Sequence, residues 1–287
     1  MKKENYPQGV LPVKVGRADF NKYINRYLSH GRRGPTTKIS RHKIFNYILF
    51  VLHTGCQWNR LPTFRHEISW SAVYQHHIRW SKDGSYQNLF ESGVEHLRWK
   101  NKLDLSILHG DGSNTVAKKG VTTLDILGTN TRKVYKELTI ADNNGFIIAP
   151  LVVRPVNEHD STLFPGSIDR LADFASLISL DLSGSFFTLD SGFDSGYNKW
   201  LIQSHGMVPV IKPNRRGTKD EKKIETMYQD FNEQIYKERF KIERVFAWQD
   251  TYRKLAHSYE RLAATRNGLK YLGYALINLR VFVRNPV

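Results

Sequence analysis

From Asp104 onward, short apolar segments of strand length alternate with longer segments of helical pattern. The turn residues Asn144 and Gly145 stand between two alternating apolar runs and predict a β-hairpin. The expected strands lie at 105–108, 133–140, 146–153, 186–189 and 207–211, and the expected helices at 161–174, 196–203 (capped by Asp194 or Ser195), 232–254 and 262–283. This order of elements predicts an α/β domain in which helices cover both faces of a mixed sheet.

The preceding part of the chain has a helical pattern. Apolar residues recur on one face of a helix that starts near Ser40 and that Gly55 is placed to end. Two further helices are expected, one from about Ser69 and one over 86–97. A basic three-helix unit with short links is typical of helix-turn-helix DNA-binding modules, although a plain helical bundle has the same spacing. We therefore predict a basic helical domain over 1–100 and an α/β domain over 101–287.

The distribution of charge indicates a polyanionic partner. The chain has a net charge of +16 and a pI of 9.8, which favours nucleic acid as that partner. Residues 1–100 carry 17 Lys/Arg and 6 Asp/Glu, residues 101–200 carry 9 and 12, and residues 201–287 carry 17 and 9. Two basic segments thus flank a mildly acidic centre. Basic flanks suit contacts to phosphates, and an acidic centre suits bound divalent cations.

Cysteine content and hydropathy exclude several other classes of protein. Cys56 is the only cysteine, so the chain has no internal disulfide and no paired-cysteine zinc site. No run of 18 apolar residues occurs, and the first residues contain no apolar signal segment. We expect a soluble protein of the cytoplasm, associated with the nucleoid and without a membrane partner.

Three acidic residues are candidates for a metal centre. Asp111 and Asp190 each come at the end of an expected strand, and Glu243 lies inside the expected helix at 232–254. In α/β sheets, side chains at strand ends point into the crevice where binding sites form. Phosphoryl transfer by two Mg²⁺ ions needs little more than carboxylates in such positions. Taken singly, the two aspartates also suit turns, and Glu243 also suits a surface ion pair with Arg239.

Several motifs occur together and in a fixed order. They are HGDGSNTVAKK at 109–119, LDSGFDS at 189–195, IERVFAW at 242–248, GCQWNRLP at 55–62, RWSKDG at 79–84 and ALINLR at 275–280. As a set they closely resemble the DDE transposases of bacterial insertion sequences, and the nearest group is insertion sequence family five. The resemblance covers about residues 39–282.

This resemblance implies an RNase H-like fold for the catalytic domain. It also implies that Asp111, Asp190 and Glu243 are the catalytic residues and bind Mg²⁺, with two ions in the site and Mn²⁺ as a substitute. Tyr236 and Arg239 reproduce part of the signature of the wider superfamily. On a continuous helix they share one face with Glu243, whereas Glu238 is turned by about 140° from Glu243.

The remaining candidates are basic residues that would contact DNA. Arg215 and Arg216 lie in the loop after the strand at 207–211. The family signature has a lysine at the position of Asp250, and Arg253 and Lys254 are the candidate replacements for it. Ser191 also departs from the residue that is usual in the family, and nothing in the sequence explains this change.

The function implied by the resemblance is transposition of an insertion sequence. The enzyme would bind the terminal inverted repeats, hydrolyse a strand to expose a 3′-OH, and direct this 3′-OH at target DNA. Joining requires two DNA ends, so a homodimer or larger synaptic complex on double-stranded DNA is implied. Two alternatives stay open: a catalytically inactive DNA-binding regulator, against which the three acids argue, and an RNase H-like nuclease that cuts without joining.

Overall fold

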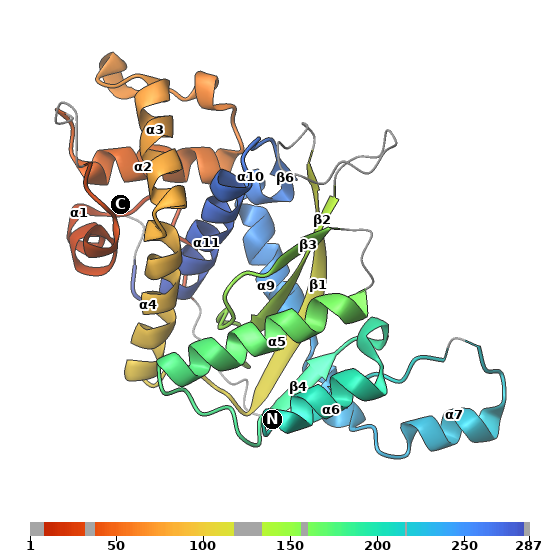
Figure 1. The fold of residues 1–287 in the computed structure, drawn as a ribbon. Helices are drawn as coiled ribbons and strands as arrows, with labels where there is room; N and C mark the ends of the chain where they lie inside the picture. Colours follow the sequence, from red (N-terminus) through yellow and green to blue (C-terminus); the bar gives the residue numbers. More distant parts are fainter. Residues whose placement is uncertain (1–8, 32–37, 118–133, 156–159, 216, 284–287) are drawn as a thin grey trace. The chain divides into compact units, whose positions relative to one another are not determined.

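The computed structural model describes residues 9–31, 38–117, 134–155, 160–215 and 217–283 of the 287-residue chain (Figure 1). The chain divides into two compact units. The first contains residues 1–96, 115–134 and 247–287, and the second contains residues 97–114 and 135–246. The C-terminal residues thus belong to the same unit as the N-terminal helices.

The first unit is helical. Its helices are α1 (Arg17–Asp19), α2 (Arg41–Thr54), α3 (Trp70–Lys82), α4 (Ser85–Trp99), α10 (Arg253–Ala256) and α11 (Ala263–Leu279), with a π-helical turn at Phe20–Ile24 and 3₁₀ turns at Asn25–Tyr27, Trp58–Arg60 and Phe64–His66. The predicted starts near Ser40 and Ser69 and the predicted stop at Gly55 are confirmed. Ser40 Oγ accepts a hydrogen bond from Lys43 N, Ser69 Oγ accepts one from Ala72 N, and Gly55 ends α2 in the left-handed conformation with φ of 71°.

The connections between these helices differ in length. Only Asp83 and Gly84 separate α3 from α4, as the prediction of short links requires. The connection from α2 to α3 spans 55–69 and contains two of the 3₁₀ turns. It is therefore much longer than the turn of a helix-turn-helix module, and the prediction of a short link was wrong at this place.

Helix α11 forms the centre of the first unit's core. Every residue from Gly268 to Leu279 is buried. A Cβ at Gly268 would lie 2.1 Å from Ser81 Oγ, so only glycine allows α3 to approach α11 so closely. Phe90 of α4 packs against Tyr271 and Tyr274, with ring centroids 5.7 and 6.0 Å apart. The N-terminal helices therefore bury their apolar faces against a helix from the other end of the chain.

The second unit contains the sheet. Its strands are β1 (Ile107–Ala117), β2 (Val134–Ala141), β3 (Val153–Pro155), β4 (Phe186–Leu189) and β5 (Val208–Ile211), and its helices are α5 (Asp160–Leu177), α6 (Gly196–Ser204), α7 (Glu221–Tyr228), α8 (Glu233–Lys237) and α9 (Phe240–Thr251). The strand order is β3-β2-β1-β4-β5, with β3 antiparallel to β2 and β4 parallel to β1 and β5. The predicted α/β class with a mixed sheet is confirmed. No helix in the described part of the chain is long and apolar enough to cross a bilayer.

The last two residues of β1, Val116 and Ala117, pair in parallel with the short strand β6 (His257–Ser258). These four residues all belong to the first unit.

The two faces of the sheet differ in polarity where β1 and β4 run side by side. Phe187 of β4 contacts Phe164 of α5, with ring centroids 5.6 Å apart, so α5 covers the apolar face (Figure 1). Successive side chains of a strand point to opposite faces. His109 and Thr188, which are paired in the register of β1 and β4, therefore point to the opposite face.

The predicted hairpin is present but interrupted. Asp142 N donates to Phe146 O, and Gly145 has φ of 74°, as a tight turn requires. Beyond the single bridge from Ala141 to Ile147, however, the expected strand at 146–153 is replaced by the short strand β3. Pro150 lies in this gap and has no N–H to donate to the ladder, so regular pairing stops there.

The predicted helix at 232–254 is broken into α8, α9 and α10. Asn232 caps α8 by accepting from Ile235 N. Glu238 N and Arg239 N then donate to carbonyls three residues back, which tightens the turn and ends the α-helix. The rotation of 100° per residue does not apply across this break. Tyr236, Arg239 and Glu243 therefore do not lie on one face of one helix, and that prediction was wrong.

Two glycines flank Asp111 in β1 and provide a matched pair of substitutions. At Gly110, a Cβ would lie 2.7 Å from Leu189 Cδ2 and 3.0 Å from Phe187 Cε1, whereas at Gly112 the nearest atom would be at an ordinary 3.7 Å. We expect Gly110→Ala to lower the free energy of unfolding by about 1–3 kcal/mol through overpacking. Gly112→Ala should change it by less than about 1 kcal/mol. Urea unfolding of both variants measures the difference, and equal effects would contradict this account of the packing.

Candidate functional site

Asp111 lies within β1, where the sequence predicted it after the strand. Its Oδ1 accepts a hydrogen bond from Gly112 N at 2.9 Å and forms an ion pair with Arg239 Nη2 at 2.7 Å. The Asp111 side chain is 21% exposed and that of Arg239 is 15% exposed. This is a half-buried, charge-assisted contact, which is stronger than an ordinary surface ion pair.

Asp190 follows β4 directly, as predicted, and its Oδ1 accepts from Gly192 N at 3.0 Å. His109 and Thr188 are paired in the parallel register, and Asp111 and Asp190 come two residues after them on their respective chains. Burial raises the pKa of Asp111 and the negative charge of Asp190 raises it further, while Arg239 and Gly112 N lower it; the net direction is upward. The two carboxylates therefore lie close enough to repel each other, and Arg239 offsets part of this repulsion.

Tyr236 and Arg239 lie beside these carboxylates, although they are not on one helix with Glu243. Burial raises the pKa of Tyr236, Arg239 lowers it, and the charges of Asp190 and Asp111 raise it. A phenol and a guanidinium thus stand next to two acids, the kind of groups that bind phosphate oxygens.

A buried polar network supports β1 next to Asp111. His109 is fully buried, with Nδ1 2.9 Å from Thr188 Oγ1 and Nε2 3.3 Å from Asn143 Oδ1. Lys241 Nζ donates to the same Asn143 Oδ1 at 2.5 Å, and Asn143 Nδ2 donates to Asp104 Oδ2 at 2.7 Å. Burial lowers the pKa of His109 to about 4, so the imidazole is neutral at neutral pH.

Sequence reasoning missed this network. Asn143 was interpreted only as a turn residue, and the buried side chain of Lys241 belongs to a helix start that the continuous helix did not predict. Lys241 Nζ also pairs with Glu238 Oε2 at 2.7 Å, and the charge of Glu238 raises the pKa of His109. A histidine that precedes a candidate catalytic aspartate by two residues in a strand was the one available signal.

Glu243 lies in the first turn of α9 and is exposed, next to the fully buried Ile242. Among the residues that the structure describes, however, no group of three His, Cys, Asp or Glu side chains could hold one metal ion. The structure brings Asp111 and Asp190 together, and it does not bring Glu243 to them.

The other predicted DNA contacts lie in different surroundings. The guanidinium of Arg215 stacks 4.7 Å from the ring centroid of Tyr228, and its Nε donates to Tyr228 Oη at 3.2 Å. Arg216 lies outside the described residues, and Arg253 is exposed at the start of α10. Lys254 is buried, and its Nζ donates to Cys56 O at 3.3 Å. This position leaves Lys254 without access to a phosphate.

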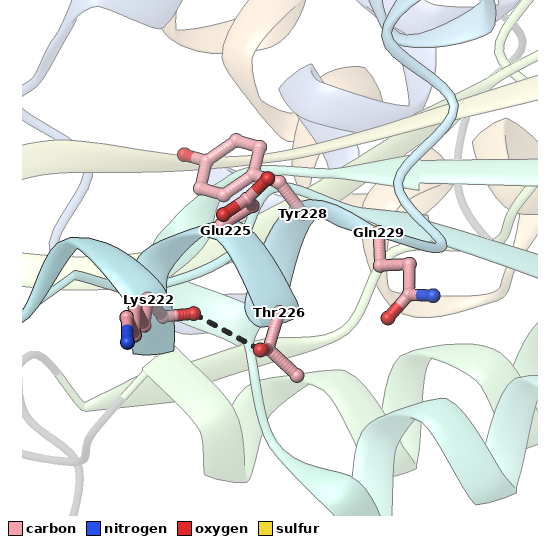
Figure 2. Close-up of a pocket in the computed structure, with 5 residues that line it drawn as sticks. All are labelled: Lys222, Glu225, Thr226, Tyr228 and Gln229. Carbon is pink, nitrogen blue, oxygen red and sulfur yellow. Dashed lines mark hydrogen bonds between the residues drawn. The ribbon is translucent and has the colours of Figure 1, made fainter.

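Neither Asp111 nor Asp190 lines the surface pocket of about 590 Å³ whose lining residues Figure 2 shows. Its lining comes from α7 and the residue that follows: Lys222, Glu225, Thr226, Tyr228 and Gln229. Thr226 Oγ1 donates to Lys222 O at 3.0 Å, so part of its polar lining is satisfied within the helix. The pocket contains no strand-end acid, and the carboxylate pair is the better candidate for chemistry.

The raised pKa of Asp111 predicts an effect on stability. The folded state disfavours the charged form of Asp111. The contribution of this group to stability is therefore lost as the pH rises through the pKa that Asp111 has in the folded protein. Asp111→Asn, which imitates the protonated form, should therefore raise the melting temperature in EDTA at pH 7. The gain should shrink as the pH falls and wild-type Asp111 takes up its proton, which its raised pKa moves to a higher pH than for an ordinary aspartate.

The matched control is Asp181→Asn, since hydrogen bonds from Ser183 lower the pKa of this exposed carboxylate. Thermal unfolding of the control should show no gain in stability. An equal rise in both variants would contradict the assigned role of burial at Asp111.

Comparisons with known proteins agree with the sequence resemblance. Residues 20–90 match the family described as "Putative transposase of IS4/5 family", and residues 119–279 match the family described as "Transposase DDE domain". The second match includes Asp190 and Glu243 and begins after Asp111. No curated protein matches the chain.

Solved structures of the Mos1 transposase are also similar. The paired-end complex with the left transposon end is 9% identical over 80% of this chain and 82% of that chain, with a TM-score of 0.29. The paired-end complex with Mg is 11% identical over 91% and 84%, with a TM-score of 0.29. Membership of the DDE family confirms the predicted RNase H-like class, to which the mixed sheet conforms. Because the model of the DDE transposase domain spans more than half of the chain, this protein belongs to the DDE transposases.

Proposed function

We propose that this transposase binds the terminal inverted repeats of an insertion sequence and catalyses metal-dependent cleavage and strand transfer at them. The observation that carries the proposal is the pair of carboxylates, Asp111 and Asp190, at neighbouring positions of two parallel strands. Acids in this position are the groups that a phosphoryl-transfer enzyme of this family needs.

The carboxylate pair fits a divalent cation. Asp111 lies half-buried beside Asp190, whose charge raises the pKa of Asp111, so a positive charge at this pair would stabilise it, and oxygen ligands are those that Mg²⁺ and Mn²⁺ prefer. Asp111 and Asp190 would hold the metal. When bound, two such ions activate the attacking oxygen and stabilise the leaving oxygen. Because the same chemistry serves hydrolysis and joining, one site suffices for both steps.

Glu243 is the proposed third ligand, on the strength of the family motif. Its exposed position in the first turn of α9 means that α9 would have to approach the strands for it to bind the same metal. The tightened turn at Glu238 and Arg239 is the place where the direction of α9 relative to α8 is set. A small change of backbone angles there would alter the position of Glu243.

Arg239 would have one role in the site without metal and another in the site with a bound cation. Without metal, its guanidinium neutralises Asp111. A cation at Asp111 would compete with this ion pair, and the released guanidinium would be close enough to bind a DNA phosphate. Tyr236 lies beside the same two carboxylates. Arg215, Arg216 and Arg253 are proposed as further phosphate contacts outside the centre, and a homodimer or larger complex would hold two transposon ends.

Removing either aspartate tests the metal centre. Asp111→Ala and Asp190→Ala should each abolish Mg²⁺-dependent nicking and joining of DNA that carries the element's ends, because each removes a metal ligand. Binding of the same DNA should persist in a gel-shift assay, since no basic residue is lost. Asp181→Ala, which removes an exposed acid of the second unit, is the control and should stay active. Cleavage at the wild-type rate by Asp111→Ala or Asp190→Ala would contradict the proposal.

Asp194, which follows Asp190 closely in the sequence, would not be a suitable control. Ser195 caps α6 by accepting from Asn198 N, while Asp194 pairs with Lys199 at 2.7 Å and accepts from Asn214 N. Its substitution would disturb the loop beside Asp190.

The third acid is tested by comparing Glu243→Gln with Glu238→Gln. Glu243→Gln should remove cleavage and joining without lowering the melting temperature, because the side chain is exposed. Glu238→Gln should keep both activities and lose some stability, because the buried ammonium of Lys241 loses its ionic partner. The reverse result, an active Glu243→Gln and an inactive Glu238→Gln, would make Glu238 the third ligand instead.

A further inference from the structure

The connection between α2 and α3 presents three consecutive exposed side chains: Phe64, Arg65 and His66. We refer to these residues as the 64–66 tip. Phe64 is 62% exposed, an unusual position for a large aromatic ring. Arg65 and His66 have φ of 47° and 53°, in the left-handed region that residues with a side chain rarely adopt. Two such residues in succession persist only where surrounding contacts hold them.

Those contacts are present on both sides of the 64–66 tip. Phe64 N donates to Tyr47 Oη at 2.8 Å, and Tyr47 Oη donates to Glu67 Oε1 at 2.7 Å. Lys43 Nζ forms an ion pair with the other oxygen, Glu67 Oε2, at 2.7 Å. Tyr47 and Lys43 belong to α2, so one helix fixes the backbone before and after the tip. Leu61 and Ile68 are buried on either side and anchor the connection in the core.

The 64–66 tip combines an apolar surface with positive charge. The Arg65 guanidinium lies 5.1 Å from the centroid of the Phe64 ring, so the cation and the ring are presented together. Contact with water does not stabilise the apolar ring of Phe64. Because hydrogen bonds and an ion pair hold the backbone of the tip in place, the exposure of the ring is not the result of a loose loop. A surface of this kind fits a partner that offers both negative charge and apolar edges.

We propose that the 64–66 tip binds duplex DNA in the minor groove, an inference that rests on the proposed DNA-binding function. Arg65 and His66 would meet the phosphates and the negative potential of the groove, and Phe64 would pack against deoxyribose and base edges. Charge complementarity supports DNA over a second protein, because residues 1–100 carry a net charge of +11. The bracing by Tyr47 and Glu67 makes the tip rigid before binding, which lowers the entropic cost of association.

Glu67 gives the proposal a test in which two effects have opposite signs. Glu67→Gln makes the protein more positive, so electrostatics alone would strengthen DNA binding. The same change removes the ion pair with Lys43 and weakens the acceptor of Tyr47, so a braced tip would become looser and bind DNA more weakly. Glu95→Gln makes the same charge change at an exposed position of α4 and serves as the control.

The experiment measures binding of the full chain to a fluorescent A·T-rich duplex of about three helical turns over a range of salt concentrations. Glu67→Gln should bind at least about threefold more weakly than Glu95→Gln. Arg65→Ala should reduce the slope of log affinity against log salt by about 0.9. Phe64→Ala should weaken binding about tenfold without changing the slope, since it removes an apolar contact. Trp99→Ala, which removes another exposed ring, should have no effect.

Equal affinities of Glu67→Gln and Glu95→Gln, or wild-type affinity of Phe64→Ala, would overturn the inference. A change of molecular mass in Phe64→Ala with unchanged DNA binding would also overturn it, because the tip would then be a protein contact. If the wild-type chain did not bind the duplex at all, the proposed function itself would fail. Thermal unfolding of each variant checks that the fold is intact.

Discussion

The parallel register between β1 and β4 is the constraint on which the candidate centre depends. Because His109 pairs with Thr188, the positions two residues further along place Asp111 beside Asp190. Gly110 is part of the same constraint, since any side chain there would collide with Leu189 and Phe187. A shift of one residue between the strands would turn one acid to the face that α5 covers and separate the two charges.

The charge balance of the centre follows from that register. Burial and the neighbouring charge of Asp190 disfavour the ionisation of Asp111, and Arg239 offsets part of this cost. The network of His109, Asn143 and Lys241 connects the same strand to the start of α9. Strand, turn and helix are thus tied by polar contacts around the site, and this rigid support is what a catalytic constellation needs.

Features with local causes could be predicted from the sequence. Ser40, Ser69 and Gly55 define helix ends through their own hydrogen bonds and backbone angles, and Asp190 follows a strand whose apolar run is plain. The break at Glu238 could not be predicted, because it accompanies distant contacts from Arg239 to Asp111 and from Lys241 to Asn143. β1 extends through its glycines, which by themselves indicate a turn.

The burial of α11 among the N-terminal helices has a consequence for how the protein is made. A ribosome synthesises residues 1–96 long before it reaches Gly268. Until then the N-terminal helices lack α11, the helix against which they bury their apolar faces. Tyr252 also reaches back, donating to Pro12 O at 3.0 Å. An unfinished or prematurely terminated chain therefore has no completed helical unit. The order of the chain therefore completes the helical unit only after the residues of the candidate centre, Asp111, Asp190 and Glu243, have been synthesised.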